Sequence, residues 1–446
     1  MSHKENLVAA IDIGTTKVVA IIGKRKENGR IEILGISKSP STGIKRGVVQ
    51  NIDETVSAIT KTIEDVQSAS GSVFSDVFVG IAGQHIKTIR NRGYINRDSY
   101  ENEIAREDID ALINEMYNIS IDVGEEIIHV LPQNFIVDNE TGIKNPVGML
   151  GRRVEANFHI VIGQITSARN IGKCINKAGL SLNELILEPL ASSAAVLTAD
   201  EKEAGVALVD IGGGTTDVAV YYDDVIRHTA VIPFGGDVVT KDIKEGCAIL
   251  QRQAELLKIQ YGSALGDIAH DDEVVSIPGI SGREPKEISL KSLAYIIQSR
   301  MEEILNAVLY EIENSGYYER LSAGIVVTGG GALLKDLPQL VKFITGMDVR
   351  LGYPNEMLAS ESLEEVNNPM FSTSVGLVIK GFEIMDQNKT KYEESDDDNE
   401  SNEDGSGNTP EFEGEEETAE GPRKGGFFNK LKQAFNDIFE ENDAEM

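Results

Sequence analysis

The 446-residue sequence contains no tryptophan, only two cysteines and six histidines. Cys174 and Cys247 are far apart in the chain, so two reduced, buried thiols in a cytoplasmic protein are expected rather than a disulfide. The scattered histidines lack the spacing of metal ligands. No run of 18 apolar residues occurs and the N-terminus carries no cleavage signature, so neither a membrane-spanning helix nor a signal peptide is expected.

Positive charge is also scarce. The sequence has 42 Lys and Arg residues against 73 Asp and Glu residues, a formal net charge of −31. This excess of acid argues against a nucleic-acid partner. Between Asp386 and Gly421 lie about fifteen acids and two lysines, a composition typical of a solvated, self-repelling tail.

One sequence unit occurs twice, in Leu7–Ile22 and in Val206–Tyr222. In each copy an apolar run leads into a Gly/Thr turn that opens with an aspartate, and a second apolar run follows. Short apolar runs joined by tight glycine turns indicate buried β-hairpins. A fold that uses the unit twice suggests two similar α/β halves facing a cleft.

The remaining periodicity predicts alternating helices and strands. Helices are expected at 51–70 (with Asp53 as a possible cap), 101–117, 165–178, 188–197, 246–262, 290–315 and 333–344. Strands are expected at 77–81, 127–130, 135–137, 154–162, 185–187 and 323–328, and the last packed element at 373–381. A charged helical segment followed by strand-like alternation of apolar and polar residues in 84–164 predicts a small α+β insertion within the first half.

The two hairpins have the chemistry of a phosphate site. Glycine lets backbone N–H groups approach phosphate closely, threonine adds hydroxyl groups, and Lys17 adds a positive donor. Asp12 and Asp210 would repel phosphate unless a cation lay between them, and Mg²⁺ fits that role. A plain hairpin with a glycine turn is the alternative, and Asp217 could simply close the second one. The candidates are Asp12, Gly14, Thr15, Thr16, Lys17, Asp210, Gly212, Gly213, Gly214, Thr215 and Thr216.

Two further features could complete a nucleotide site. The run Gly329, Gly330, Gly331 and Ala332 follows a predicted strand, where a flat ring or phosphate could lie against the main chain. No GxxxxGK[ST] motif occurs. Glu255 and Lys258 share a helix face at i, i+3 spacing. They either form a surface ion pair or reach a ribose and adenine.

Glu188 ends a predicted strand and precedes Pro189, so the backbone fixes its position. The carboxylate could orient an attacking water or hold the water shell of a metal ion. Alternatively, it is an acid that complements the N-terminal dipole of a helix.

The C-terminal segment RKGGFFNKLKQAFNDIFEENDAEM (423–446) predicts an amphipathic helix. Phe428, Leu431, Phe435, Ile438 and Phe439 share one face, with Phe427 at its margin, and Lys430 and Lys432 belong to a basic cluster. Apolar faces flanked by basic residues bind in the bilayer interface. Docking in a protein groove is the alternative.

These residues resemble the actin-like ATPase superfamily and, within it, the FtsA family of bacterial cell-division proteins. The matching segments are IDIGTTKV (11–18), GIKNPVGMLGRRVEA (142–156), VDIGGGTTDVAVY (209–221), RHTAVIPFGGDVVTKDI (227–243), AGIVVTGGGALL (323–334) and STSVGLV (372–378). The insertion with its GIKNPVG motif and the C-terminal helix point to FtsA within the superfamily.

The resemblance implies an α/β, actin-like (ribonuclease H-like) fold with duplicated domains around a nucleotide cleft. The expected parts are subdomain 1A (1–83 and 165–204), the insertion 1C (84–164), 2A (205–239 and 316–385), 2B (240–315), a disordered acidic linker (386–422) and a membrane-targeting helix (423–440).

ATP and Mg²⁺ are the implied cofactors, with Asp12 and Asp210 facing the metal ion. Gly236, Glu255 and Lys258 correspond to a nucleotide-lining segment of the family. Glu188 is the implied catalytic residue. Since some family members lack that carboxylate, at most a slow ATPase is expected.

The implied role is a scaffold that polymerises on the cytoplasmic face of the inner membrane at the division septum. It would anchor FtsZ filaments through the FtsZ C-terminal peptide and recruit later divisome proteins. Arg300 is a candidate contact with FtsZ, although an ion pair with Glu303 explains it equally well. A small-molecule kinase and a pilus-assembly actin homologue remain alternative functions.

Overall fold

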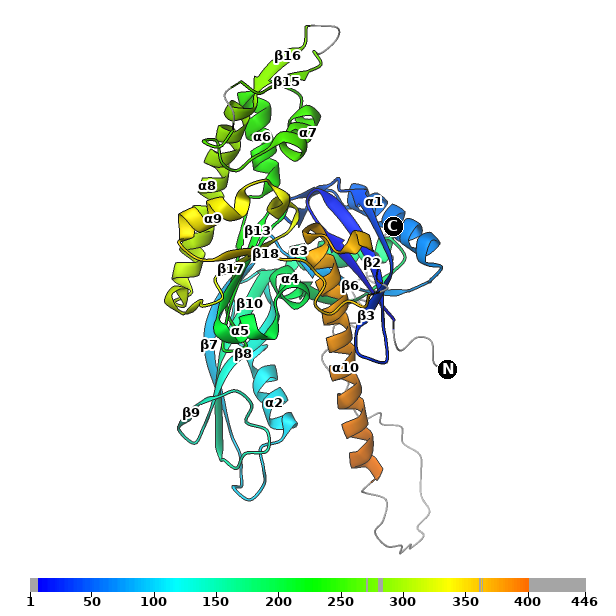
Figure 1. The fold of residues 1–446 in the computed structure, drawn as a ribbon. Coiled ribbons are helices and arrows are strands. Elements are labelled where there is room, and N and C mark those ends of the chain that lie inside the picture. Colours follow the sequence, from blue (N-terminus) through cyan, green and yellow to red (C-terminus); the bar gives the residue numbers. More distant parts are fainter. Residues whose placement is uncertain (1–6, 270–271, 280–283, 361, 363, 401–446) are drawn as a thin grey trace, which may run out of the picture. The chain divides into compact units, whose positions relative to one another are not determined.

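The computed structural model describes residues 7–400, apart from 270–271, 280–283, 361 and 363, with side chains described as far as residue 389. The chain consists of two compact units, residues 1–389 and 390–446, each of which contacts mainly itself. The sites below all lie in the first unit (Figure 1). Its two cysteines are free and buried, as predicted.

The first copy of the repeated unit belongs to a five-stranded sheet of order β11-β6-β1-β2-β3. The predicted hairpin is confirmed: β1 and β2 are antiparallel, and β6 runs parallel to β1. The strands are β1 (Leu7–Ile13), β2 (Lys17–Arg25), β3 (Ile31–Pro40), β6 (Asp76–Ile81) and β11 (Ser181–Leu187), with a small pair β4 (Ile44–Lys45) and β5 (Val48–Val49) nearby in sequence. We call this sheet and its helices the first lobe.

Helices α1 (Ile52–Ser70) and α3 (Ile165–Lys177) pack against one face of this sheet through a buried apolar cluster. Asn51 caps α1, because its side chain accepts hydrogen bonds from the N–H groups of Asp53 and Glu54. The predicted cap at Asp53 is therefore wrong by two residues.

The second half repeats the same plan, with sheet order β14-β13-β12-β17-β18. The second hairpin is antiparallel and β17 runs parallel to β12, as β6 does to β1. The strands are β12 (Val206–Ile211), β13 (Thr216–Tyr222), β14 (Val225–Ile232), β17 (Ile325–Thr328) and β18 (Val349–Leu351). This sheet forms the second lobe together with α8 (Leu290–Asn314) and α9 (Leu337–Thr345), which share its core.

The rest of the second lobe contains α6 (Gly236–Gly246), α7 (Gln251–Tyr261) and the hairpin of β15 (Val274–Ile277) and β16 (Lys286–Ser289). The helix predicted for 246–262 is therefore too long, because Ala248 takes a left-handed conformation between α6 and α7. The helix predicted at 333–344 likewise begins only at Leu337, after Asp336 with a φ of 64°.

The predicted insertion forms a separate antiparallel sheet of order β7-β10-β8-β9, with α2 against it. Its elements are β7 (Lys87–Asn96), α2 (Arg106–Met116), β8 (Glu125–Val137), β9 (Glu140–Ile143) and β10 (Arg153–Gln164). The two strands predicted at 127–130 and 135–137 are one strand, β8. We call residues 84–164 the inserted domain.

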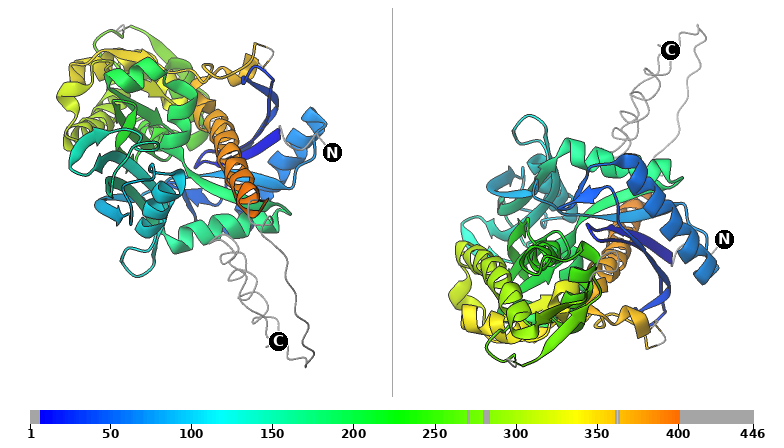
Figure 2. Two further views of the ribbon diagram at one scale, coloured as in Figure 1. Left: turned by 90° about the horizontal axis from the view of Figure 1, so that it is seen from below. Right: turned by 90° about the horizontal axis from the view of Figure 1, so that it is seen from above.

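Two helices lie between the sheets: α4 (Glu188–Val196), which is followed by the short α5 (Ala199–Ala204), and the first turns of α10 (Ser372–Glu400) (Figures 1 and 2). They touch closely, since a Cβ atom on Gly376 would lie 1.8 Å from the carbonyl oxygen of Ala191. Only glycine permits this approach.

Helix α10 differs from the prediction in two ways. Val378 and Gly381 pack against Gly23 and Phe78 of the first lobe, although 372–385 was assigned to the second half. The helix also continues to Glu400, so a disordered linker from 386 is wrong for 386–400. Asp386 pairs with both terminal nitrogens of Arg25, at 2.5 and 2.8 Å, which fixes this part of the helix. Residues 401–422 and the predicted helix 423–440 lie outside the described residues.

Candidate functional site

The tips of the two hairpins face each other. A Cβ atom on Gly213 would lie 2.3 Å from Cγ2 of Thr16, and one on Gly214 would lie 2.3 Å from Oγ1 of Thr15. The second tip therefore needs glycine because the threonines of the first tip occupy the space of any side chain. The two copies of the repeat meet at a single site.

A cavity of about 60 Å³ lies at these tips. Segments from both lobes line it: Asp12, Ile13, Gly14, Thr15, Thr16, Lys17, Gly47, Ala82, Glu188, Asp210, Gly212, Gly213, Gly214, Thr215, Asp217, Gly329, Gly330, Met370 and Thr373. Most predicted phosphate-site residues are thus brought together. The volume is well below the hundreds of Å³ of ordinary ligand pockets.

Four carboxyl groups converge on the cavity: Asp12, Asp210, Asp217 and Glu188. The register of β12 and β13 places Asp217 directly opposite Asp210, whereas Val19 lies opposite Asp12 in the first hairpin. Asp217 therefore belongs to the site and does more than close a hairpin. Its Oδ1 atom is buried and has no hydrogen-bond partner.

Burial is the main cause of the shifted pKa values in this cluster. It raises the pKa values of Asp12 and Asp210, and it raises those of Asp217 and Glu188 well above their usual range. The neighbouring carboxyl groups raise the pKa values of Asp217 and Glu188 further. Burial also lowers the pKa of Lys17, the one cation among the cavity-lining residues. The site thus holds more acid than its lysine can neutralise.

Hydroxyl groups from the two central helices hold the paired aspartates. Ser374 donates to Asp12 at 2.9 Å, while Ser192 and Thr373 donate to Asp210 at 2.6 and 3.1 Å. Sequence reasoning missed these three residues. The only local signal was the Ser-Thr-Ser run at the start of α10, which carries no chemistry until the fold brings it to the aspartates.

Lys17 points toward the same helix start. Its Nζ atom donates to the carbonyl oxygen of Met370 at 2.6 Å. Glu188, the first residue of α4, lies against β6, where a Cβ atom on Gly80 would be 3.1 Å from its Cγ atom.

The glycine run after β17 has two different roles. Gly329 and Gly330 line the cavity, whereas Gly331 and Ala332 do not. A Cβ atom on Gly331 would lie 2.3 Å from the Ile211 side chain, and Ala332 is part of the second-lobe core. The second pair therefore packs the motif against β12.

Glu255, Lys258, Gly236 and Thr216 are not among the residues that line the cavity. Lys258 Nζ contacts Glu255 at 2.8 Å and the carbonyl oxygen of Gly236 at 3.0 Å, which joins α7 to α6. The structure thus contains the ion pair that was the alternative interpretation. Thr216 donates to the carbonyl oxygen of Phe234 at 2.8 Å. Their contact with a ribose or adenine stays a prediction.

Arg300 forms ion pairs with Asp242 of α6 and Glu303 of α8, each at 2.5 Å. A role in partner binding stays a prediction. To contact a partner, the guanidinium group would have to give up these two ion pairs. The candidate membrane residues 427–439 lie outside the described residues. None of the described helices combines the length and the hydropathy that a bilayer-spanning segment needs.

Two similar lobes around a cleft, each with a β-hairpin whose tip reaches the other, define the actin-like fold. A type IV pilus biogenesis complex of PilM and PilN matches with a TM-score of 0.59 and 15% identity, covering 85% of this chain and 98% of that chain. MreB5 of Spiroplasma citri bound to ADP matches with a TM-score of 0.51 and 16% identity, covering 86% and 98%. These likenesses establish the predicted fold alone.

The family follows from sequence comparison. Residues 207–376 match the model of the cell division protein FtsA, and residues 83–162 match the SHS2 domain inserted in FtsA, which overlaps the predicted insertion. FtsA of Pseudomonas aeruginosa is 40% identical over 84% of this chain and 89% of its own length. FtsA of Escherichia coli K12 is 35% identical over 84% and 90%. The chain belongs to the FtsA family of cell division proteins, as predicted.

Proposed function

We propose that this chain binds Mg²⁺ and ATP between its lobes and acts as a filament-forming adaptor of the division ring. The observation that carries the proposal is the convergence of two glycine- and threonine-rich tips, four buried carboxyl groups and one lysine on one cavity. Backbone N–H groups at the tips suit phosphate oxygens, and Lys17 supplies a matching positive charge.

The residues present fit a magnesium ion. Asp217 Oδ1 is buried without a partner, and burial raises the pKa values of all four carboxyl groups, so a cation would be favoured beside them. Among the described residues, no three His, Cys, Asp or Glu side chains form a direct metal cluster. We therefore infer that Asp12 and Asp210, assisted by Asp217, would hold Mg²⁺ through water molecules and phosphate oxygens. When bound, the ion supplies positive charge next to the phosphates.

Glu188 is the residue of the site suited to hold a water molecule. In its present surroundings the raised pKa favours the neutral carboxyl group, which cannot act as a base. A bound cation nearby would lower this pKa and favour the carboxylate. Turnover would therefore depend on prior binding of the metal ion.

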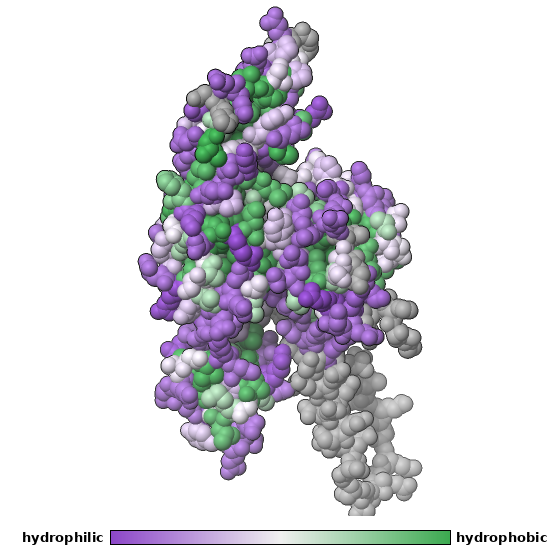
Figure 3. Space-filling view, in the orientation of Figure 1, coloured by the Kyte–Doolittle hydropathy of each residue, from purple (hydrophilic) through white to green (hydrophobic). Residues whose placement is uncertain are grey.

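The adaptor role extends this nucleotide function to partners. The predicted helix at 423–440 would attach the chain to the cytoplasmic face of the membrane at the septum, and 240–315 would bind the FtsZ C-terminal peptide. Helix α7 exposes Leu256 and Ile259 in this region, and Figure 3 shows apolar residues interspersed with polar ones there. Exposed apolar side chains on a helix are one kind of surface on which a peptide can dock. The inserted domain would contact neighbouring copies or later divisome proteins.

The decisive experiment combines ATP binding with vesicle sedimentation. The full chain should sediment with anionic phospholipid vesicles in the presence of ATP and carry FtsZ polymers with it. A chain lacking 423–446 should bind ATP with unchanged affinity and stay in the supernatant. Sedimentation of the shortened chain with vesicles would show that the membrane assignment is wrong.

A further inference from the structure

We propose that His129 of the inserted domain is a positioning residue for Glu188, so that the insertion helps to set the geometry of the nucleotide cleft. The proposal rests on the proposed function of Glu188. His129 lies on β8 and is not among the residues that line the cavity, so it would act through the backbone.

The contact joins the insertion to the residue before Glu188. The N–H group of Leu187 donates a hydrogen bond to Nε2 of His129 at 3.0 Å. Leu187 is fully buried, the last residue of β11 and the N-cap of α4, and β11 is an edge strand of the first-lobe sheet. Because β6 occupies only one side of β11, the N–H group of Leu187 needs a partner from outside the sheet.

The protonation state of His129 suits this task. Burial, assisted by the charge of Lys380, lowers the pKa of His129 to about 4. The ring is therefore neutral near pH 7. Because Nε2 accepts the hydrogen bond, the ring proton is on Nδ1.

The corner at Glu188 is held from three sides. Before Glu188, Leu187 pairs with Ile81 of β6 and its N–H group is bound by His129. After Glu188, Pro189 restricts the backbone. The constraints from β6 and Pro189 come from the first lobe itself. His129 alone among the three comes from the inserted domain.

Strand β8 also contacts the second lobe. Gln133 Nε2 donates to the carbonyl oxygen of Ile226 on β14 at 2.6 Å, and Arg227 donates to Asn134 Oδ1 at 2.8 Å. His129 and Gln133 are four residues apart on one strand, so β8 links the Glu188 corner to the opposite lobe. Relative motion of the lobes must therefore either shift β8 at the corner or break one of these contacts.

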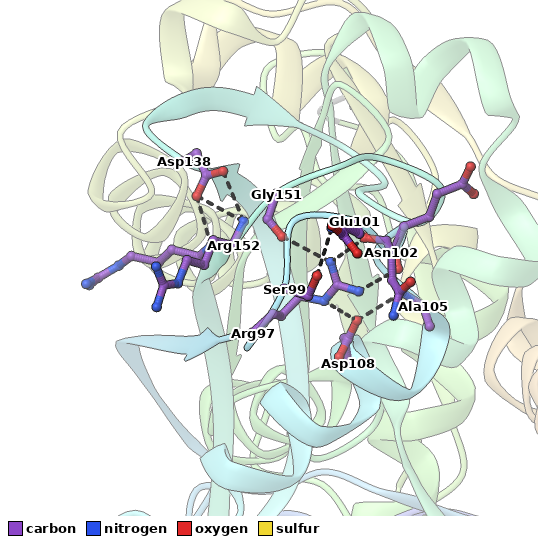
Figure 4. A network of polar contacts seen from close by, with 11 residues as sticks. Arg97, Ser99, Glu101, Asn102, Ala105, Asp108, Asp138, Gly151 and Arg152 are labelled. Carbon is purple, nitrogen blue, oxygen red and sulfur yellow. Dashed lines mark hydrogen bonds and ion pairs between the residues drawn. The ribbon is translucent and has the colours of Figure 1, made fainter.

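Arg97 ties together the loop, helix α2 and the segment before β10 at one end of the inserted domain. Arg97 donates to the carbonyl oxygens of Asn102, Glu103 and Gly151 and pairs with Asp108 at the start of α2 (Figure 4).

The test compares His129→Phe, which removes the acceptor but keeps a ring, with His129→Gln, which restores an acceptor. In the full chain, His129→Phe should lower single-turnover ATP hydrolysis roughly tenfold or raise the Mg²⁺ concentration needed for ATP binding by a similar factor. Its ATP affinity at saturating Mg²⁺ should stay within about twofold. His129→Gln should recover most of the loss.

Two controls make the result specific. His85→Phe replaces a partly buried histidine at the start of the same domain whose ring nitrogens have no hydrogen-bond partner, and it should change neither quantity. Adding His129→Phe to Glu188→Gln should cause no further loss, because both would act through one carboxylate. Melting temperatures would show that each variant is folded.

The outcomes separate this proposal from the one on which it rests. If Glu188→Gln changes neither hydrolysis nor the Mg²⁺ requirement, the proposed role of Glu188 fails, and with it the role of His129. If Glu188→Gln is impaired but His129→Phe behaves as wild type, only the positioning role is overturned. Failure of His129→Gln to recover a loss seen in His129→Phe would also contradict it.

Discussion

The two hairpins share a backbone plan but divide the chemistry between them. The first tip carries Lys17 and has Val19 opposite Asp12, whereas the second has three glycines and Asp217 opposite Asp210. Both tips provide threonine hydroxyl groups, but only the first adds a cation to the cavity lining, and only the second adds two further glycines and a further acid. The same backbone geometry therefore carries different side chains at matching positions: Val19 opposite Asp12 in the first hairpin, and Asp217 opposite Asp210 in the second.

The largest expected effect comes from filling the bare tip. Gly213→Val should weaken ATP binding roughly 100-fold, because its side chain would occupy the space of Thr16. Fluorescent-nucleotide titration measures the loss. The milder Gly213→Ala should recover when combined with Thr16→Ser, which removes the nearest atom, Cγ2, and keeps the hydroxyl group. No recovery in this double variant would mean that the glycine serves something other than contact between the tips.

Removing the cation of the first hairpin should have the next largest effect. Lys17→Met should reduce ATP affinity roughly 10- to 100-fold through loss of a charge-assisted contact with phosphate. Isothermal titration calorimetry with Mg²⁺-ATP would report it. The matched control is Lys24→Met at the other end of β2, which should bind normally. Equal losses in the two variants would indicate a general effect of net charge.

Removing the additional acid of the second hairpin should separate metal binding from stability. Asp217→Asn should raise the Mg²⁺ concentration needed for ATP binding roughly tenfold. The same change should raise the melting temperature of the ligand-free chain, because it removes a buried acid whose Oδ1 atom has no partner. A variant that lost stability and kept its Mg²⁺ dependence would assign Asp217 a structural role.

The smallest expected effect is on the pH dependence of the ligand-free chain. The folded-state pKa values of Asp217 and Glu188 are raised from ordinary values of 3.8 and 4.5. A raised folded-state pKa means that stability is full below the ordinary value and is lost as pH rises through the raised value. Melting temperature should therefore fall by a few degrees as pH rises from about 5 to 8, and Asp217→Asn should reduce this slope. An unchanged slope would show that Asp217 does not titrate in this range.

Local patterns predicted the parts of the fold that depend on local sequence. Apolar residues at periods of 2 and 3.6 predicted the hairpins, α1, α3 and α8. A change in the hydrophobic pattern along the chain predicted the inserted domain. The residues of the two tips that line the cavity were found for the same reason, since each set is contiguous in sequence.

Features that depend on long-range contact escaped prediction. Ser374 acts only because α10 brings it to Asp12, more than 300 residues earlier in the chain. His129 looked like any histidine on a strand, and its partner is the backbone of Leu187, which has no side-chain signature. The extension of α10 to Glu400 was missed because the acidic composition of this segment is typical of a solvated tail.

The central claim is that Asp12 and Asp210, one from each lobe, hold one magnesium ion with ATP. The most direct test is the Mg²⁺ dependence of ATP binding in the full chain and in Asp12→Asn, Asp210→Asn and the double variant. The account predicts Mg²⁺-dependent binding in the wild type, loss of that dependence in each single variant, and little further loss in the double variant. Tight ATP binding that is independent of Mg²⁺ and unaffected by either substitution would contradict it.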